Sequence, residues 1–257
     1  MIGALQGMRV LVTRPARQAA ALCQRLQQAG ASARLLPLFE IAPPLDPEAA
    51  IQKLRAAATA NLWIFTSANA VRGAARLCPH GWPDTLFAIG AGTERALAAL
   101  GCTALTPEVS SSEALLLWPE LDNVGGLEVL VATGEGGRTL LAETLAERGA
   151  LVSVARTYRR QPLPLAAQAV TEALDGCDVA LITSGESLLL LLAATPLAQR
   201  PMLLALPLVV PAARVVELAR QAGFCGPLLV PDTVSDAAYV ERLQRWRHQD
   251  AEPQPDR

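Results

Sequence analysis

Short apolar segments alternate with amphipathic segments along nearly the whole chain. Arg9–Thr13 has the composition of a buried strand, and the next segment keeps a helical spacing of apolar residues from Pro15 to Gln28, where Gly30 ends it. This alternation predicts an α/β fold with mainly parallel sheets. It also predicts strands at Leu62–Thr66, Leu86–Ile89, Glu128–Ala132, Leu151–Tyr158 and Val179–Thr183, and helices at Asn69–Leu77, Thr93–Leu100, Arg138–Arg148, Glu186–Ala194 and Ala212–Ala222.

The chain also contains a weak internal repeat. Arg9–Val12 matches Glu128–Val131, and Ile64–Ser67 matches Leu181–Ser184, at a separation of about 120 residues. We therefore expect two similar halves. A third match, in the same order, pairs Pro107 and Ser112-Glu113-Ala114 with Pro231 and Ser235-Asp236-Ala237.

The domain boundaries do not follow from the repeat alone. A length of 257 residues fits one large domain or two small ones. The repeat suggests a boundary near Gly125-Gly126, but prolines cluster at Pro37–Pro47 and at Pro162–Pro164. Two such irregular passages predict that the chain crosses twice between domains.

Composition excludes several classes of protein. The chain is 51% apolar and 18% charged, which is enough for a buried core, and its net charge of −2 argues against nucleic acid or an anionic membrane as partner. Lys53 is the only lysine and reads as a solvated helix charge, and His80 and His248 are the only histidines. Schiff-base chemistry, a P-loop lysine, a histidine triad and a histidine metal site are therefore disfavoured.

The ends of the chain and the cysteines indicate the compartment. The first residues lack the pattern of a signal peptide, and no apolar run reaches the length of a membrane span. Five scattered cysteines without a C-x-x-C motif predict neither disulfides nor a thiolate metal site. We expect a cytoplasmic protein whose polar tail, Arg247–Arg257, is frayed.

Ligands of open parallel sheets bind where strands end and helices begin. The turns at these places are small, hydroxylic or glycine-rich, and several carry an arginine, which suits carboxylates or phosphates. For any single turn, helix capping is the better explanation, but the number of such turns favours an anion-binding site. They are Thr13-Arg14, Thr66–Asn69, Gly90–Thr93, Gly134–Arg138, Thr183–Gly185 and Pro211–Arg214.

Two glycine-rich turns resemble nucleotide-binding loops only in part. Gly90–Arg95 has an arginine where the dinucleotide fingerprint needs its third glycine. Gly134–Gly137 has the wrong spacing and no lysine after it, so it is either an anion-holding nest or a flexible turn. Tyr158, one of two tyrosines, stands beside Arg156 and Arg159 and is either a proton donor to a leaving group or an amphipathic strand end.

Taken in order, these turns resemble the uroporphyrinogen-III synthase family from about Met8 to Leu243. The resemblance rests on Val10–Pro15, Phe65–Val71, Ile89–Thr93, the Gly134–Arg138 turn, Val154–Arg159 and Thr183-Ser184. It implies two Rossmann- or flavodoxin-like parallel-sheet domains joined by a two-stranded crossover, with the active site in the cleft between them. The discontinuous domain would combine residues 1–39 with 162–257, and residues 40–161 would form the other.

The resemblance also implies a reaction. A lyase of this family closes the linear tetrapyrrole hydroxymethylbilane to uroporphyrinogen III in porphyrin biosynthesis, with loss of water and inversion of ring D through a spiro intermediate, and without metal or organic cofactor. The substrate carries eight carboxylates and cyclises unaided to the wrong isomer. The enzyme must therefore mainly hold a reactive chain in one conformation, for which helix N-termini and arginines are suited.

Site residues follow from the resemblance position by position. Tyr158 matches the family's tyrosine that assists departure of the hydroxyl. The sequence departs from the family at Pro211–Arg214, where a hydroxyl residue is common, and at Asn69, where some members have a basic residue. The expected substrate-binding residues are Thr13, Arg14, Ser67, Asn69, Thr93, Gly134, Arg138 and Ser184.

Two other functions remain open from the residues. One is a non-catalytic two-lobed binding protein that closes on a small anionic ligand. The other is a nucleotide-dependent Rossmann enzyme, which the incomplete glycine fingerprint disfavours. We expect a monomer that uses a small-molecule substrate, with no cofactor, no nucleic acid and no membrane as partner.

Overall fold

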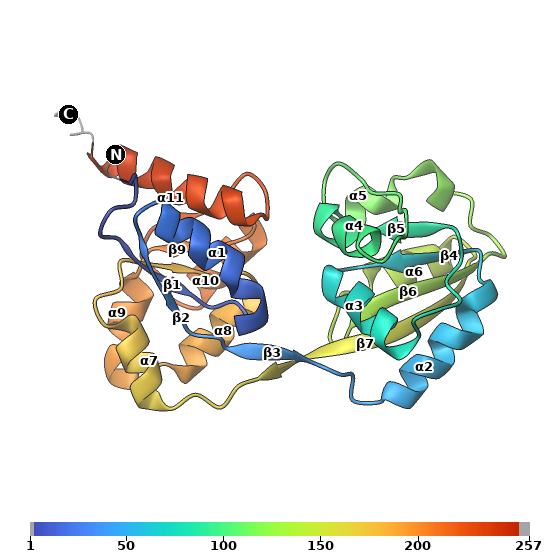
Figure 1. Ribbon diagram of the computed structural model, residues 1–257, viewed down its shortest axis with the longest axis horizontal. Coiled ribbons are helices and arrows are strands. Elements are labelled where there is room, and N and C mark those ends of the chain that lie inside the picture. Colours follow the sequence, from blue (N-terminus) through green and yellow to red (C-terminus); the bar gives the residue numbers. More distant parts are fainter. Residues whose placement is uncertain (1–2, 252–257) are drawn as a thin grey trace. The chain divides into compact units, whose positions relative to one another are not determined.

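The computed structural model describes residues 3–251, in which the chain forms two compact units. One unit combines the chain up to Glu40 with the chain from Pro162 onward, and the other is Ile41–Gln161. Each unit has a five-stranded sheet with helices packed against it (Figure 1). The mainly parallel α/β fold predicted by the alternating pattern is confirmed.

The first unit, residues 3–40 and 162–251, is built on the strand order β10-β9-β8-β1-β2. All recorded strand pairs in this sheet are parallel, and the order is that of a flavodoxin-like doubly wound sheet. Its elements are β1 (Arg9–Val12), α1 (Ala16–Gln28), β2 (Ser32–Leu35), α7 (Ala167–Leu174), β8 (Val179–Leu181), α8 (Gly185–Ala194), η3 (Leu197–Gln199), α9 (Arg200–Ala205), β9 (Leu208–Val209), α10 (Ala213–Gln221), β10 (Leu228–Leu229) and α11 (Asp236–Ala251).

The second unit, residues 41–161, has the strand order β3-β7-β6-β4-β5. The pairs β4/β5, β4/β6 and β6/β7 are parallel. The elements of this sheet and its helices are β3 (Phe39–Ala42), α2 (Pro47–Ala56), η1 (Ala57–Thr59), β4 (Leu62–Phe65), α3 (Ala68–Leu77), β5 (Leu86–Ala88), α4 (Ala91–Ala98), α5 (Ser112–Leu116), η2 (Pro119–Leu121), β6 (Glu128–Gly134), α6 (Leu140–Glu147) and β7 (Leu151–Pro162).

The internal repeat relates the central strands of the two sheets. β1 and β8 are neighbours in the first sheet, and their counterparts β6 and β4 are neighbours in the second. In the first unit, α1 packs with α11, and α8 packs with α10. In the second unit, α6 packs with α5, and α3 packs with α2 and α4. The helices that follow the two central strands of each sheet therefore lie on opposite faces of that sheet. The point between these two strands is a topological switch point, and ligands of open α/β sheets bind at such points.

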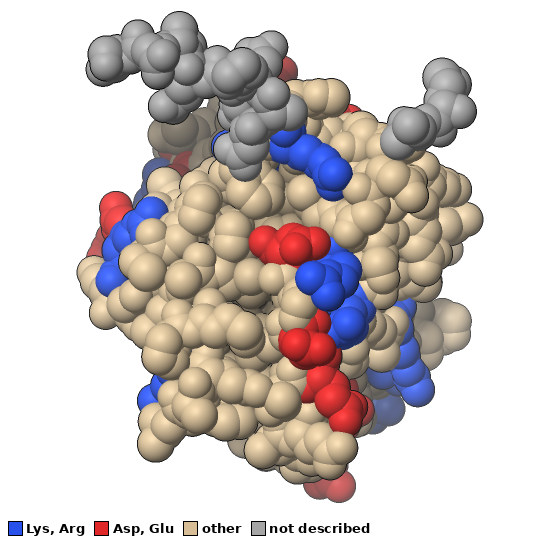
Figure 2. Space-filling view, turned by 90° about the vertical axis from the view of Figure 1, so that its left-hand side faces the viewer, with Lys and Arg blue, Asp and Glu red and all other residues tan. Residues whose placement is uncertain are grey.

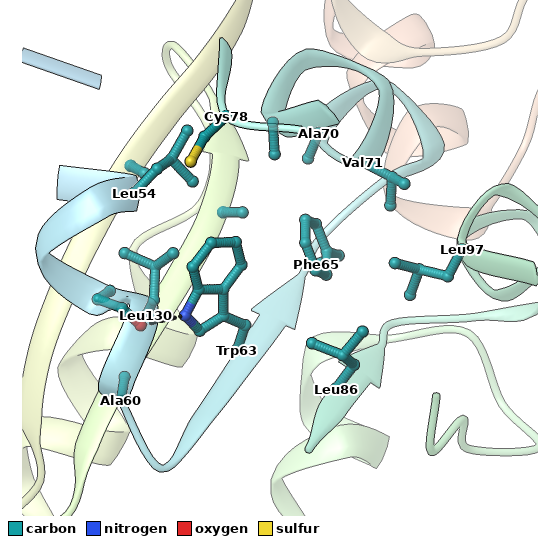
Figure 3. Packing of buried hydrophobic residues seen from close by; sticks show 14 of the residues in the cluster. Leu54, Ala60, Trp63, Phe65, Ala70, Val71, Cys78, Leu86, Leu97 and Leu130 are labelled. Carbon is teal, nitrogen blue, oxygen red and sulfur yellow. Dashed lines mark hydrogen bonds between the residues drawn. The ribbon is translucent and has the colours of Figure 1, made fainter. Parts of the chain in front are cut away.

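The core of the second unit fixes the position of β4. Trp63 and Phe65 are fully buried beneath α2 and α3, and Leu54 and Val71 pack against them (Figure 3). The Trp63 ring nitrogen donates a hydrogen bond to the Ala57 carbonyl at 2.8 Å. Burying both aromatic rings anchors the strand that leads into Ser67.

Small residues bring α3 close to β7. A Cβ atom added at Gly73 would collide with the backbone of Thr157, and Ala70 and Ala74 are fully buried on the same helix. Only a helix with such a small face can approach the strand so closely. The contact holds α3 against the part of β7 that carries Tyr158.

Several predicted boundaries are wrong. β7 does not end at Tyr158 but continues to Pro162, because its last residues pair with β3. Helix α6 begins at Leu140, so Arg138 lies in the preceding turn. The predicted frayed tail is helical as far as Ala251, while residues 252–257 lie outside the described residues. The alternating pattern does not predict β2, β3, β9 or β10, although the family resemblance implies a two-stranded crossover; β9 and β10 have only two residues each, too few to give a periodic pattern.

Between residues 3 and 251, no single helix is both long and apolar enough to span a membrane. Only α8 together with Leu197–Ala205 reaches that length, and the two parts are bent by 115°.

Candidate functional site

The carboxyl ends of the central strands hold most of the predicted site residues. In the second unit, Ser67 follows β4 and Gly134 ends β6. In the first unit, Thr13 follows β1 and Ser184 comes soon after β8. These residues therefore form two groups, one at the switch point of each sheet, whereas Thr93 lies in α4, which follows the edge strand β5.

Ser67 begins α3 and contacts Tyr158. Its Oγ accepts a hydrogen bond from the Ala70 backbone N–H at 3.1 Å, which is the geometry of an N-cap. The same hydroxyl donates to Tyr158 Oη at 3.2 Å. Because Tyr158 Oη accepts this bond, its own proton can be donated to another oxygen.

A β-bulge in β7 gives Tyr158 its orientation. Thr133 pairs with Arg156 but Gly134 pairs with Tyr158, so Thr157 is an extra residue in the strand. Thr157 and Tyr158 both face α3: the Thr157 hydroxyl donates to the Ala70 carbonyl at 3.0 Å, and Tyr158 reaches Ser67. Bulges commonly redirect a side chain near a functional site in this way.

Gly134 makes room for the tyrosine ring. A Cβ atom added at Gly134 would lie 2.5 Å from Tyr158 Cζ and 2.9 Å from Cε1 and Cε2. Tyr158 is only 3% exposed and belongs to the core cluster of Trp63 and Phe65. The ring is thus enclosed by the core and Gly134, and its hydroxyl is directed to the end of β4.

Two backbone N–H groups in the turn after Gly134 are bonded within the protein. The Glu135 N–H donates to the Tyr158 carbonyl at 2.9 Å, and the Gly137 N–H donates to the Gly134 carbonyl at 3.2 Å. Gly136 has φ +67°, which favours glycine. With those two N–H groups bonded internally, Arg138 is the group in this turn that suits an anion; it pairs with Glu113 at 3.0 Å.

Asn69 and Thr93 lie in the first turns of α3 and α4. The side-chain oxygen of Asn69, Oδ1, accepts a hydrogen bond from the Arg72 guanidinium at 3.4 Å, and buried Thr93 donates its N–H to the Gly90 carbonyl at 2.9 Å. A Cβ atom added at Gly90 would collide with Ser110. The first glycine of the incomplete nucleotide motif therefore has a packing role.

In the first unit, hydroxyl groups bond within the protein. Thr13 is fully buried and donates to the Leu181 carbonyl at 2.9 Å, which joins the ends of β1 and β8. Ser184 is the N-cap of α8 and accepts from the Ser187 N–H at 3.1 Å. The Pro211–Arg214 turn places Ala212 at the N-cap of α10, without a side-chain hydrogen bond.

Arg14 is paired with an acidic residue that was not predicted. Its guanidinium contacts Asp236 Oδ1 at 2.5 Å, with the side chains 17% and 24% exposed. Cys23 and Tyr239 lie near this ion pair. Burial raises the pKa of the Cys23 thiol and the pKa of the Tyr239 phenol above their ordinary values. Tyr239 is fully buried in the core of this unit, as a packing residue.

On the face shown in Figure 2, acidic and basic side chains lie next to one another beside a wide uncharged area. No group of three or more His, Cys, Asp or Glu side chains within residues 3–251 could hold a metal ion. The predicted site residues themselves offer hydroxyls, a phenol and arginines.

A separate hollow of about 460 Å³ lies in the second unit, between the start of α2, the turn after β6, and β7. Lys53 lines it and donates to the Val154 carbonyl at 3.0 Å, so this lysine is not only a solvated charge. Asp46, Glu135 and Arg156 also line the hollow. The mixture of charges gives no single class of ligand.

Comparison with known proteins identifies the family. The family model described as uroporphyrinogen-III synthase HemD matches residues 20–240. The chain belongs to the uroporphyrinogen-III synthase family. Uroporphyrinogen-III synthase from Salmonella typhimurium is 35% identical over 247 residues, covering 92% of this chain and 100% of the relative. Uroporphyrinogen-III synthase from Escherichia coli is 33% identical over 247 residues, which cover 92% of this chain and 100% of the relative.

Solved structures of this family share the fold. A mutant uroporphyrinogen III synthase from Thermus thermophilus has a TM-score of 0.65 at 21% identity and covers 95% of this chain and 100% of its own. The Helicobacter pylori enzyme has a TM-score of 0.63 at 14% identity and covers 93% and 99%. The predicted family and fold class are confirmed, and the chain is an enzyme of the uroporphyrinogen-III synthase type.

Ser67 and Ser184 allow a matched test of the local structure. Each caps a helix through a backbone N–H at 3.1 Å, and alanine removes that bond. We expect Ser67→Ala and Ser184→Ala each to lower the free energy of unfolding by about 1 kcal/mol. Denaturant unfolding checks the values; an unchanged stability for either variant would contradict the capping geometry.

Sequence reasoning missed four residues at these strand ends. Thr133 accepts a hydrogen bond from Thr66 at 2.9 Å, and Thr157 lies in the bulge. Asp236 and Glu113 pair with predicted arginines. The signal for the two acids was present in the third match of the internal repeat, where Ser-Glu-Ala corresponds to Ser-Asp-Ala.

Proposed function

We propose that this chain cyclises hydroxymethylbilane to uroporphyrinogen III, with loss of water and inversion of ring D. Membership of the family supports this reaction. The observation that carries it is the Tyr158 hydroxyl at the end of β4, next to the N-cap of α3. A phenol held there is suited to donate a hydrogen bond to the leaving hydroxyl of the substrate.

The remaining residues are proposed to hold the substrate. Its carboxylates suit the arginines Arg14 and Arg138 and the helix starts at Ser67, Asn69, Thr93 and Ser184. Because Thr13 is fully buried and bonded to Leu181, its proposed part is to keep the ends of β1 and β8 together. Gly134 acts through the space it leaves for Tyr158.

The test is the identity of the product. Freshly prepared hydroxymethylbilane should give uroporphyrinogen III when the protein is present and isomer I when it is absent or heat-denatured. Chromatographic separation of the two isomers after oxidation measures the ratio. Isomer I alone in the presence of folded protein would contradict the proposal.

The same assay separates the proposal from its alternative. A non-catalytic binding protein for a small anion would bind the bilane without changing the ratio of isomers. The proposed reaction uses no metal or organic cofactor, so we expect the ratio to be unaffected by a chelator or by added nucleotide. Cytoplasmic location and a monomeric state remain predictions from the sequence.

A further inference from the structure

An arginine and an acidic residue are paired at corresponding places in both units. Arg14 lies between β1 and α1, and Arg138 lies between β6 and α6, whose strand is the repeat counterpart of β1. Asp236 is in the first turn of α11, and Glu113 is in the first turn of α5. The third match of the repeat aligns the two acids with each other, and in each unit the acid pairs with an arginine in the turn after a central strand.

Helix packing explains why each acid reaches its arginine. α1 packs beside α11, and α6 packs beside α5. Each helix beginning therefore lies near a turn that follows a central strand. Ser235 and Ser111 cap the two acidic helices through the Ala238 and Ala114 N–H groups at 3.2 and 3.0 Å, so neither acid is needed as the N-cap.

Both pairs lie at the carboxyl edge of a sheet, where the proposed function needs carboxylates to bind. A carboxylate of the protein on the arginine presents the same chemistry as a carboxylate of the substrate. We propose that Asp236 and Glu113 are internal stand-ins: each occupies an arginine in the ligand-free protein and is displaced by a substrate carboxylate. This inference rests on the proposed function, because it assumes a polycarboxylate ligand.

The two pairs differ in burial, which sets how strongly each acid competes. Arg14 and Asp236 are 17% and 24% exposed, whereas Arg138 and Glu113 are 54% and 55% exposed. Charges that are partly removed from water interact more strongly than exposed ones. Displacing Asp236 from Arg14 therefore costs more free energy than displacing Glu113 from Arg138, and it opposes binding of a substrate carboxylate more strongly.

The prediction is that removing either acid tightens polycarboxylate binding. The probe is uroporphyrin III, a stable octacarboxylate, titrated calorimetrically into the full-length protein. We expect Asp236→Asn to lower Kd about five- to tenfold and Glu113→Gln about two- to threefold. Added salt should reduce both gains, because it screens the arginines released from their partners.

Two ion pairs at the opposite edges of the sheets provide controls. Asp178 pairs with Arg9 at 3.9 Å where β8 and β1 begin, and Asp122 pairs with Arg148 at 3.3 Å before β6 and β7. Asp178→Asn and Asp122→Asn each remove one negative charge from an arginine–carboxylate pair, as Asp236→Asn and Glu113→Gln do. We expect neither to change Kd by more than about 1.5-fold, since each arginine lies at an amino edge.

Each result decides between roles. Equal tightening by all four variants would show a general charge effect and overturn the proposal. If Asp236→Asn binds uroporphyrin III more weakly than the wild type or equally well, Asp236 holds Arg14 in place and does not compete with the ligand. That result also overturns the proposal. If Asp236→Asn does not fold, Asp236→Ser replaces it, and Glu113→Gln tests the second unit independently. Wild-type protein that makes no uroporphyrinogen III would refute the proposed function; normal product with unchanged Kd in both variants would refute only the stand-in role.

Discussion

Replacing Gly134 with alanine is expected to lower kcat for uroporphyrinogen III formation about 100-fold, because a displacement of about 1 Å in a catalytic group can have that effect. The new Cβ would lie 2.5 Å from Tyr158 Cζ, so the ring must move. The ring is enclosed by the core of the second unit, so we also expect a loss of about 1–3 kcal/mol in the free energy of unfolding. Initial rates and denaturant unfolding measure the two effects.

Gly125 provides the control for this substitution. A Cβ atom there would be 3.8 Å from the Arg148 carbonyl, which is an ordinary contact, and the turn lies before β6. Gly125→Ala should leave kcat unchanged and the protein at least as stable. A Gly134→Ala variant with the kcat of the wild type would mean that the position of the Tyr158 ring is unimportant for the reaction.

Tyr158→Phe is expected to lower kcat by about 100-fold, the lower end of what a positioned proton donor contributes. The ring and its packing remain, and only the hydroxyl next to Ser67 is lost. The loss should be partial, because holding the substrate in one conformation supplies much of the rate. KM should change little, since the hydroxyl is proposed to act on the leaving group.

Tyr239→Phe is the matched control for the lost phenol. Tyr239 is the other tyrosine, is fully buried, and contacts the Ile182 carbonyl at 3.5 Å. Its hydroxyl has no proposed part in the reaction, so kcat should be that of the wild type. Equal losses in the two phenylalanine variants would point to stability as the cause, and an unchanged kcat for Tyr158→Phe would remove Tyr158 from the mechanism.

The fold could be predicted because buried parallel strands have a clear pattern. Leu62–Phe65 is fully buried, and its sequence is a continuous apolar run between polar turns. The end of β7 has no such pattern: Arg159, Arg160 and Gln161 resemble a loop, and they are in a strand only because β3 pairs with them. Pairing between distant segments cannot be inferred from local periodicity.

The site could be predicted only where it depends on strand ends. Ser67 and Ser184 follow buried strands, so a parallel sheet places them at its carboxyl edge. The contact between Gly134 and Tyr158 depends on a bulge, for which the sequence of β7 gives no signal. Asp236 reads locally as a helix-start residue, and its pairing with Arg14 arises from the packing of α11 on α1.

We propose that the Tyr158 hydroxyl assists loss of water and that Ser67 positions this hydroxyl. A double-mutant cycle with Ser67→Ala and Tyr158→Phe measures this most directly, with kcat for uroporphyrinogen III formation as the readout. If Ser67 acts through Tyr158, Ser67→Ala should lower kcat about five- to tenfold in the wild type and have no further effect in Tyr158→Phe. If Ser67→Ala lowers kcat equally in the wild type and in Tyr158→Phe, Ser67 does not act through the Tyr158 hydroxyl.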